Sequence, residues 1–361
     1  MNSLESPFDN VLQEDLDKVT EIIEVDKLKN ASVLVTGATG LIGVSIARTL
    51  LCLNRKKNTN IKIFLLIRNE KKAQSIYGNL LSRPEMSIVV ADVTEKINID
   101  FKIDYIFHCA SITSSKEMIE HPVETLNTSI EGTNNILKLA TEKQVKSVVY
   151  VSSMEMYGTF KEGYDDVTEQ DLGYINPLAI RSNYPESKRV CENMCVAYYH
   201  EYGVNVKIAR LAQTFGAGIL QGENRVFAQF ARSVINNQDI VLHTKGLSEG
   251  NYCYTRDAIA GLFTILLKGT NGEAYNVANP MTHTTINNMA EMVSQKIASG
   301  QIKVIYDIPD SNKFGYAADT KMKLNSDKLQ RLGWKPEIDL EEAYRRLIKS
   351  MENKNNEESV R

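Results

Sequence analysis

The sequence lacks the features of a nucleic-acid-binding or membrane protein. Its 361 residues hold 42 Lys and Arg against 45 Asp and Glu, a formal net charge of −3, with no block of basic residues. A basic block is the electrostatic footprint of proteins that bind nucleic acid or anionic membranes, so we expect neither partner. No run approaches the roughly 18 apolar residues of a membrane span.

Cysteine is also scarce, with five residues, an odd number without the paired spacing of a zinc site. Cys191 and Cys195 share a predicted helix face, but no His or Asp stands close by, so packing is the better interpretation and we expect no metal. Unpaired thiols are typical of a reducing compartment, which predicts a cytoplasmic protein. The first 30 residues are acidic and polar, unlike a signal peptide.

The first strong motif follows a β-branched run over residues 31–35. Residues 36–43 read Thr-Gly-Ala-Thr-Gly-Leu-Ile-Gly and lead into a helix predicted to end near residue 52. Between a strand and a helix, such glycines permit a tight turn, a close approach to a pyrophosphate and close helix packing. The phosphates would meet the unpaired N–H groups of the helix N-terminus. We therefore predict a dinucleotide site formed by Gly37, Thr39, Gly40, Leu41, Ile42 and Gly43.

Further residues of this site follow the next three predicted strands. Arg68 stands where an acidic residue usually holds the ribose of NAD, and an Arg can instead meet the 2′-phosphate of NADP or be a solvated loop charge. Asp92 and Val93 end the third strand, where a carboxylate can reach the adenine amino group. Ala110 and Ser111 form a small-residue turn that leaves room for the cofactor. The cofactor is therefore NAD or NADP.

A Tyr and a Lys stand four residues apart in residues 181–189, Arg-Ser-Asn-Tyr-Pro-Glu-Ser-Lys-Arg. On a helix, Tyr184 and Lys188 lie on one face, one turn apart. A phenol with a pKa near ~10 is a poor base at neutral pH, and a neighbouring ammonium favours its phenolate. The pair suits proton removal from a sugar hydroxyl whose carbon loses hydride. The alternative is an amphipathic helix that happens to hold both residues.

Two polar residues follow the fifth predicted strand. Ligands of open α/β sheets bind beyond the carboxyl ends of the strands, so Ser153 and Glu155 should point at the site. Ser153 is placed to bond the reacting oxygen and share its proton with Tyr184, and Glu155 puts a carboxylate near the substrate. Their alternative roles are a turn-forming Ser and a surface Glu.

Strand and helix alternate from residue 31 onward, which predicts an α/β fold: a doubly wound parallel (Rossmann) sheet with a smaller interleaved C-terminal substrate lobe. We expect an N-terminal helical extension over residues 1–30, with its helix within 13–28, and an NAD(P)-binding Rossmann domain over 31–212. Residues 213–350 form mostly the substrate-binding lobe, with segments that return to the Rossmann domain. Residues 351–361 are expected to be a flexible tail.

Together with Arg-x-x-x-Thr-Phe-Gly at residues 210–216, these motifs resemble the extended short-chain dehydrogenase/reductase family, and within it the nucleotide-sugar epimerases, dehydratases and decarboxylases. The resemblance covers roughly residues 31–347. It implies Ser153, Tyr184 and Lys188 as catalytic residues, with Lys188 also on the nicotinamide ribose. It also implies a tightly bound NAD or NADP, where family habit favours NAD and Arg68 favours NADP. A nucleotide-sugar substrate and a homodimer complete the expectation.

The resemblance further implies transient oxidation at sugar C4. The resulting 4-keto sugar can be reduced from its other face (epimerisation), lose water, or lose a carboxylate as carbon dioxide. Epimerisation is the main prediction, and decarboxylation is the first alternative because of Glu155. Dehydration is disfavoured because Met154 replaces an acidic residue that protonates the departing hydroxyl in the dehydratases.

The chain departs from the family pattern at the substrate phosphates. Many members hold the diphosphate with an Arg at the position of Gly250, so Arg225, Lys245 or Arg256 must serve here, or the substrate differs. The expected substrate-binding residues are Ser111, Ser153, Met154, Glu155, Gln213, Thr214, Arg225, Lys245 and Arg256.

Two other classes of protein remain open. An NADPH-dependent sugar reductase would explain Arg68 and would exchange its cofactor at every turnover. A non-catalytic dinucleotide-sensing protein could use the same fold, but such proteins commonly lose the Tyr/Lys pair that this chain keeps.

Overall fold

A seven-stranded sheet organises the computed structural model, which describes residues 4–160, 166–309 and 319–360. Its strands are β1 (Ser32–Thr36), β2 (Lys62–Ile67), β3 (Met86–Val90), β4 (Tyr105–His108), β5 (Ser147–Ser153), β6 (Val206–Leu211) and β11 (Ala274–Val277). Their order is β11-β6-β5-β4-β1-β2-β3, and every neighbouring pair is parallel. The predicted doubly wound sheet is confirmed.

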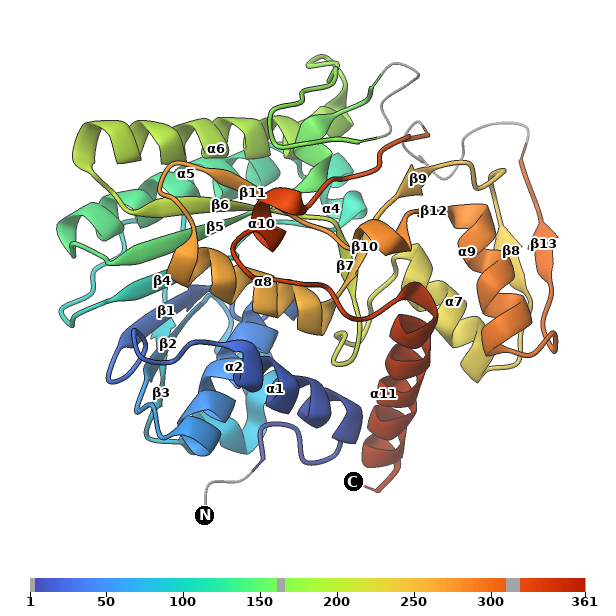
Figure 1. Ribbon diagram of the computed structural model, residues 1–361, viewed down its shortest axis with the longest axis horizontal. Helices are drawn as coiled ribbons and strands as arrows, with labels where there is room; N and C mark the ends of the chain where they lie inside the picture. The colour runs from blue at the N-terminus through green and yellow to red at the C-terminus, as the bar shows by residue number, and fades with distance from the viewer. Residues whose placement is uncertain (1–3, 161–165, 310–318, 361) are drawn as a thin grey trace.

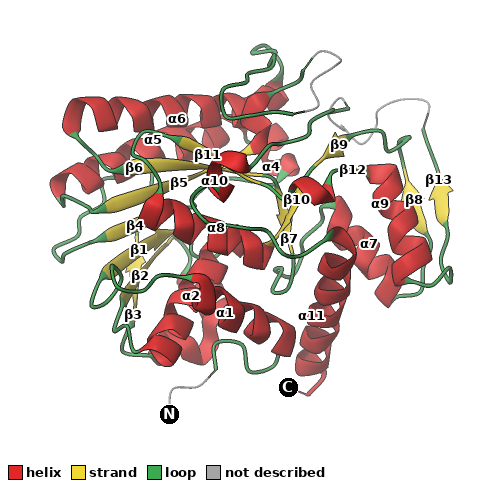
Figure 2. Cartoon of the chain, viewed as in Figure 1, coloured by secondary structure: helices red, strands yellow, loops and turns green. Residues whose placement is uncertain are grey.

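Helices cover both faces of this sheet, as parallel crossovers require (Figure 2). They are α2 (Leu41–Lys57), α3 (Glu70–Tyr77), α4 (Ser115–Glu120), α5 (Pro122–Glu142), α6 (Asn183–Tyr202) and α8 (Thr255–Lys268). Val148 of β5 joins the core under α5 and α6, whereas Val149 joins the core under α2 and α8. Successive strand residues point to opposite faces, so one apolar strand serves both cores.

The helix after the glycine turn is longer than predicted. α2 continues beyond residue 52 to Lys57, and Asn58 ends it in the left-handed conformation with φ 51°. Three basic residues fill its last turn, where they stabilise the negative end of the helix dipole. Asn tolerates this conformation better than most residues, which explains the end point.

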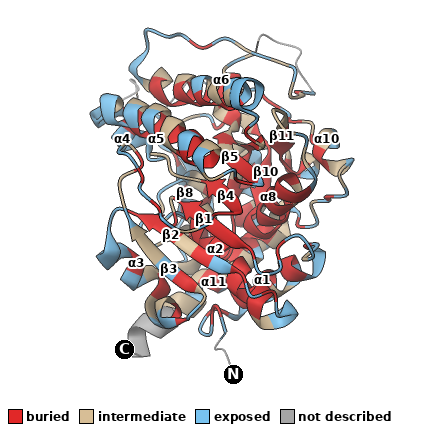
Figure 3. Cartoon of the chain, turned by 90° about the vertical axis from the view of Figure 1, so that its left-hand side faces the viewer, coloured by how far each residue is buried: buried red, intermediate tan, exposed pale blue. Residues whose placement is uncertain are grey.

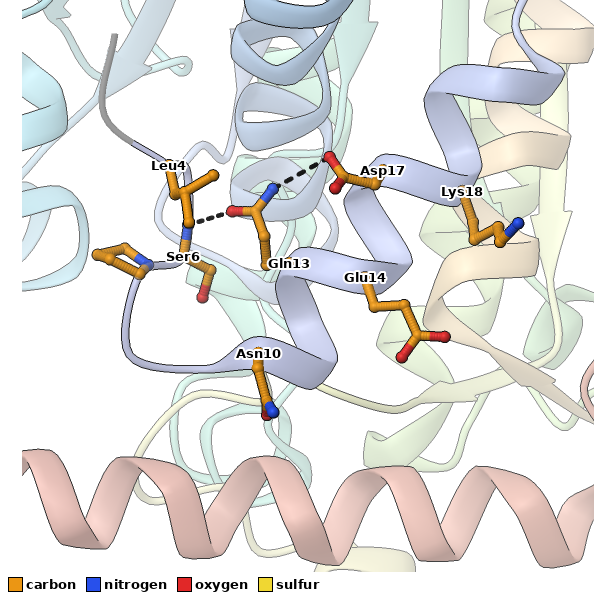
Figure 4. A pocket seen from close by; sticks show the side chains of 8 residues that line it. Leu4, Ser6, Asn10, Gln13, Glu14, Asp17 and Lys18 are labelled. Carbon is orange, nitrogen blue, oxygen red and sulfur yellow. Dashed lines mark hydrogen bonds between the residues drawn. The ribbon is translucent and has the colours of Figure 1, made fainter. Parts of the chain in front are cut away.

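The N-terminal segment forms a helix that packs on both lobes. α1 (Asn10–Ile22) begins before the predicted range of 13–28, because the Asp9 side chain caps it by accepting from Leu12 N, and it ends earlier than predicted, at Ile22. Leu12 and Leu16 join the core of the smaller C-terminal lobe, which is predicted to bind the substrate and is therefore called the substrate lobe. Val19 joins the core of the sheet. Figure 4 shows the start of this helix, where the Gln13 amide bridges Ser6 N and the Asp17 carboxylate.

The substrate lobe lies beside the sheet (Figure 1) and contains three two-stranded sheets. They pair β7 (Gln213–Phe215) with β10 (Tyr252–Tyr254), β8 (Ile240–Leu242) with β13 (Val304–Tyr306), and β9 (Glu249–Gly250) with β12 (Thr284–Thr285). Its helices are α7 (Val226–Ile235), α9 (Ile286–Met292), the π-helical turn η5 (Val293–Ile297) and α11 (Leu340–Val360). Aromatic rings fill its core, since Phe215 lies 4.8 Å from Phe227 and 5.2 Å from Tyr344 between ring centroids.

The lobe is interleaved with the Rossmann domain, because α8 and β11 return to the sheet; α10 (Asp327–Gln330) packs beside them. Residues 351–360 of the expected tail lie in α11, where Lys354 Nζ donates to the Ile219 carbonyl at 2.6 Å, and residue 361 lies outside the described residues. Among the described residues, no helix combines the length and apolarity needed to cross a membrane.

Candidate active site

The glycine turn between β1 and α2 forms a tight cradle. Gly37 has φ +61°, and a Cβ there would lie 2.7 Å from the Ala110 backbone nitrogen. A Cβ on Gly43 would lie 2.4 Å from the Gly37 carbonyl oxygen. Around Gly40, by contrast, the nearest such contact is 3.4 Å. The turn is therefore tightly packed at Gly37 and Gly43 and has space beside Gly40, as the approach of a pyrophosphate requires.

The N-terminus of α2 opens onto this cradle. Gly40 is its N-cap and supplies no side-chain bond to the first turn, so the free N–H groups of that turn remain available to an anion. Thr39, Leu41 and Ile42 are half-buried around it. The predicted phosphate-binding residues thus fit a dinucleotide.

Arg68 and Asp92, both predicted at the adenosine end, lie at the ends of β2 and β3 with Arg68 Nη1 3.5 Å from Asp92 Oδ2. Asp92 Oδ1 also accepts from Thr94 N at 2.9 Å and Thr94 Oγ1 at 2.8 Å. Burial would raise the pKa of Asp92, but these hydrogen bonds and the Arg68 charge outweigh burial and hold that pKa below its usual value. The carboxylate is therefore ionised and partly balances Arg68.

Val93 and Ser111, two further residues predicted to bind the cofactor, differ in their surroundings. A Cβ on Gly132 would lie 2.9 Å from Val93 Cγ2, so Val93 sets how closely α5 approaches. Ser111 Oγ is buried and has no hydrogen-bond partner within the described residues. A buried hydroxyl without a partner is costly, which fits a group that bonds to a ligand.

His108 at the end of β4 is a fixed hydrogen-bonding group. Its ring lies between Thr36 Oγ1, 2.7 Å from Nδ1, and Thr133 Oγ1, 3.2 Å from Nε2. Burial, with a smaller effect from the Lys188 charge, lowers the pKa of His108 to about 3. The ring is therefore neutral at physiological pH and ties β4 to β1 and α5.

The structure brings Ser153, Tyr184 and Lys188 together at the carboxyl edge of the sheet. Ser153 ends β5, while Tyr184 and Lys188 occupy the first turns of α6, both buried. Lys188 Nζ donates to the Val151 carbonyl at 2.9 Å and lies 5.5 Å from the centroid of the Tyr184 ring. The Ser153 side chain also acts on Tyr184 and lowers the pKa of its phenol.

The protonation of Tyr184 differs from the expectation based on Lys188 alone. Burial is the largest effect and, with the negative charge of Glu155, raises the pKa of Tyr184 above its usual value. The Ser153 side chain and the charges of Arg181 and Arg225 oppose this rise. Burial also lowers the pKa of Lys188. The spacing of the pair was predicted correctly, but desolvation outweighs the attraction because both groups lie inside the protein.

Glu155 forms an ion pair beside Tyr184. It belongs to the 3₁₀ turn η2 (Met154–Tyr157), and Arg181 belongs to the turn η3 (Ile180–Ser182). Arg181 Nη2 lies 2.9 Å from Glu155 Oε2 and 3.3 Å from Oε1. Sequence reasoning gave Arg181 no role, although its place three residues before Tyr184 was a usable signal.

Met154 and Gly250, the two departures from the family pattern, face one another. Met154 is buried, and a Cβ on Gly250 would lie 3.5 Å from the Met154 methyl carbon. A longer side chain at position 250 would have to pass Met154. The Met at position 154 and the Gly that replaces the family's Arg at position 250 are therefore neighbours in the structure.

Arg225 and Lys245, two of the predicted phosphate-binding residues, are exposed. Arg225 precedes α7 and binds Glu223 through both nitrogens of its fork, at 3.0 and 2.6 Å. Its charge lowers the pKa of Tyr184 slightly, against the larger effect of burial. Gln213 and Thr214 lie on β7, where Thr214 Oγ1 donates to the Ala212 carbonyl at 2.9 Å.

Arg256, the third candidate, contacts carboxylates of the protein itself. It is buried at the start of α8, with Nη2 2.9 Å from Glu337 Oε2 and Nη1 3.8 Å from Asp15 Oδ1. These carboxylates come from the segment before α11 and from α1. Arg256 is thus paired within the protein, and its role in substrate binding stays a prediction.

Sequence reasoning also missed a buried network beneath the trio. Ser152 Oγ donates to Glu192 Oε1 at 2.6 Å, and Arg210 Nη2 bonds Glu192 Oε2 at 2.7 Å. Arg210 Nη1 donates to the Tyr157 hydroxyl oxygen at 2.9 Å. Glu192 stands one helical turn after Lys188, and this spacing could have indicated the network from the sequence. Across the described ranges, no three His, Cys, Asp or Glu side chains gather as a metal site would require.

The chain resembles known proteins both in sequence and in fold. A family model described as NAD dependent epimerase/dehydratase family matches residues 33–278. UDP-glucuronic acid decarboxylase 6 of Arabidopsis thaliana is 27% identical over 315 residues, 87% of either chain. UDP-glucuronic acid decarboxylase 1 of Xenopus tropicalis is 27% identical, over 88% of this chain and 71% of the relative.

Solved structures share the fold. UDP-glucose 4-epimerase of Thermotoga maritima has a TM-score of 0.74 at 19% identity, over 90% of this chain and 99% of its own. A dTDP-glucose 4,6-dehydratase of Streptomyces venezuelae has a TM-score of 0.74 at 21% identity, over 90% and 98%. The family match spans more than half of the chain and confirms the resemblance seen in the motifs. The protein belongs to the NAD-dependent epimerase/dehydratase family of enzymes.

Proposed function

We propose that this enzyme transiently oxidises C4 of a nucleotide-linked sugar and that the outcome is epimerisation at that carbon. The observation that supports this proposal is the assembly of Ser153, Tyr184 and Lys188 at the same sheet edge as the glycine cradle. When bound, NAD supplies the reversible hydride acceptor. Epimerisation needs no further proton donor, because the hydride returns to the other face of C4 and Tyr184 returns the proton to the C4 oxygen.

Each residue of the trio has a separate task. Tyr184 takes the proton of the C4 hydroxyl as the C4–H bond gives up its hydride. Ser153 acts on Tyr184 and lowers the pKa of the phenol against the effect of burial. Lys188, anchored on the Val151 carbonyl, holds a positive charge near the phenolate as it forms.

Decarboxylation is the second candidate. Two of the relatives described above carry the name UDP-glucuronic acid decarboxylase, and Glu155 places a carboxylate next to Tyr184. For this outcome the substrate would be a nucleotide-linked uronic acid. Met154 disfavours dehydration, because a thioether cannot protonate a departing hydroxyl.

Product analysis tests these outcomes. The purified protein would be incubated without added cofactor with UDP-, GDP-, CDP- and dTDP-sugars, uronic acids included. An isomer of unchanged mass supports epimerisation, and loss of carbon dioxide supports decarboxylation. Product only after addition of NADPH would overturn the redox-neutral proposal. It would favour a reductase in which Arg68 binds the 2′-phosphate of NADPH.

Replacing Tyr184 by Phe tests the mechanism. We expect turnover to fall at least about 10³-fold while NAD stays bound, because the variant loses its proton acceptor and keeps the aromatic ring. Tyr202→Phe, on the exposed end of the same helix, is the matched control and should keep wild-type turnover. Substantial activity in Tyr184→Phe would contradict the proposed role.

A further inference from the structure

The ion pair between Glu155 and Arg181 lies between the strand end that carries Ser153 and the helix that carries Tyr184. Arg181 Nη2 contacts both carboxylate oxygens, at 2.9 and 3.3 Å. The guanidinium carbon of Arg181 lies 5.9 Å from the centroid of the Tyr184 ring. One cation therefore contacts the carboxylate and stands near the phenol at the same time.

We propose that Arg181 is a positioning residue that fixes the Glu155 carboxylate and balances its negative charge at the Tyr184 hydroxyl. The inference rests on the proposed function, since it takes Tyr184 as the proton acceptor. A charge-assisted bond of this length is strong, and an Arg fork restrains the direction of the carboxylate as well as its charge.

The balance of charge between Glu155 and Arg181 affects how readily the buried Tyr184 hydroxyl loses its proton. Two cations lie near the ring, Arg181 of η3 at 5.9 Å and Lys188 of its own helix at 5.5 Å from the centroid. The charges of Glu155 on η2 and of Arg225 before α7 also act on the pKa of Tyr184. The phenol is buried, so a neighbouring charge is poorly screened by water. Burial and Glu155 raise the pKa of Tyr184, whereas Arg181 lowers it. Without Arg181, the carboxylate would lose its direct partner and act more strongly on the phenol.

Hydrogen bonds hold the chain segments that carry Glu155 and Arg181 in place. Ser153 Oγ accepts from the Glu155 backbone N–H at 3.2 Å, so the backbone of Glu155 is held by the residue that also acts on Tyr184. Asn183 Nδ2, two residues after Arg181, donates to the Met118 carbonyl and fixes the start of α6 on α4. Both partners of the ion pair are therefore held on anchored backbone.

The test is a four-protein comparison without substrate: wild type, Arg181→Met, Glu155→Gln and the double variant, all loaded with NAD. Phenolate absorbance would be followed up to about pH 11 as the difference from Tyr184→Phe in each background, so that the signal belongs to Tyr184. We expect Arg181→Met to ionise at a pH higher by about one unit, Glu155→Gln at a lower pH, and the double variant close to wild type. Arg181→Lys should also stay close to wild type, and Arg181→Gln replaces the Met variant if that one does not fold.

Several outcomes would overturn the inference. Identical titration in all four proteins would do so. If none of them ionises by about pH 11, the pH dependence of kcat in the same four proteins decides instead, and identical profiles would overturn the inference. With the sugar that the product panel identifies, Arg181→Met should lower kcat about tenfold at neutral pH with little change in KM, because a one-unit shift leaves a tenth of the phenolate. A rise in KM confined to uronic acids would instead assign Arg181 to the substrate carboxylate. Inactivity of the wild type would argue against the proposed function, while the titration would still decide the role of Arg181.

Discussion

Gly37 and Gly203 both adopt the left-handed backbone region, with φ of +61° and +69°, but only Gly37 lies against other backbone atoms. A Cβ on Gly37 would meet Cys109 and Ala110 within 2.8 Å, whereas nothing lies within 4 Å of a Cβ on Gly203. Comparing the two glycines separates two costs of adding a side chain, which are backbone strain and steric overlap.

Alanine substitutions measure these costs. Gly203→Ala should lower the free energy of unfolding by about 1–2 kcal/mol, the strain of a left-handed alanine. Gly37→Ala should lose about 1–3 kcal/mol more through overpacking and should also weaken NAD binding. Urea denaturation and calorimetry of NAD binding check both effects. Equal losses in the two variants would contradict the close packing of the cradle.

At the scale of elements, α1 joins the two lobes through buried charges. Asp15 is buried, lies 2.8 Å from Arg346 Nη2 of α11 and accepts a hydrogen bond of 2.6 Å from Tyr254 of β10. At the other lobe, the buried Glu5 accepts from Arg55 at 2.8 Å and from Arg83 at 2.9 Å. The expected extension is therefore a brace between the lobes.

Removing one charge from this brace should be costly. Asp15→Asn leaves Arg346 without its closest carboxylate and should lower the free energy of unfolding by about 3 kcal/mol, as breaking a buried pair does. Glu21→Gln on the same helix removes a half-exposed pair with Lys18, 3.2 Å long, and should change stability by less than about 1 kcal/mol. Denaturant titration checks both. A loss in Asp15→Asn no larger than in the control would show that the brace contributes little.

At the scale of the whole molecule, the outer surfaces of α5 and α6 carry apolar side chains. Figure 3 shows these helices side by side with exposed outer faces. Val123 and Val190 are exposed there, and Ile130 and Met194 are partly buried. The homodimer expected from the family resemblance would cover these residues, because two such helix pairs form a four-helix bundle.

Charging this face should separate the dimer. We expect twice the mass of one chain in light scattering for the wild type and a single chain for Val190→Glu, because dimerisation would bury the new carboxylate. Val241→Glu on β8 is matched in exposure, 44% against 43%, and should leave the mass unchanged. A monomeric wild type, or a dimeric Val190→Glu, would count against this interface.

The local patterns of the sequence determined the fold class and much of the candidate site. The apolar run over residues 31–35 predicted β1, observed over Ser32–Thr36, to within one residue, since a buried parallel strand must be apolar on both faces. The glycine spacing predicted the cradle, and the four-residue spacing predicted that Tyr184 and Lys188 share a helix face. These features depend on neighbours in the chain, so the sequence alone contains them.

Tertiary structure decided what depends on contacts between distant segments. The pairing of Glu155 with Arg181 joins residues 26 apart, and that of Asp15 with Arg346 joins residues 331 apart. The same holds for the Met154 methyl against Gly250 and for the capture of Arg256 by structural carboxylates. Packing also set the direction of the pKa of Tyr184, because desolvation depends on everything that surrounds a group and no local pattern reports it.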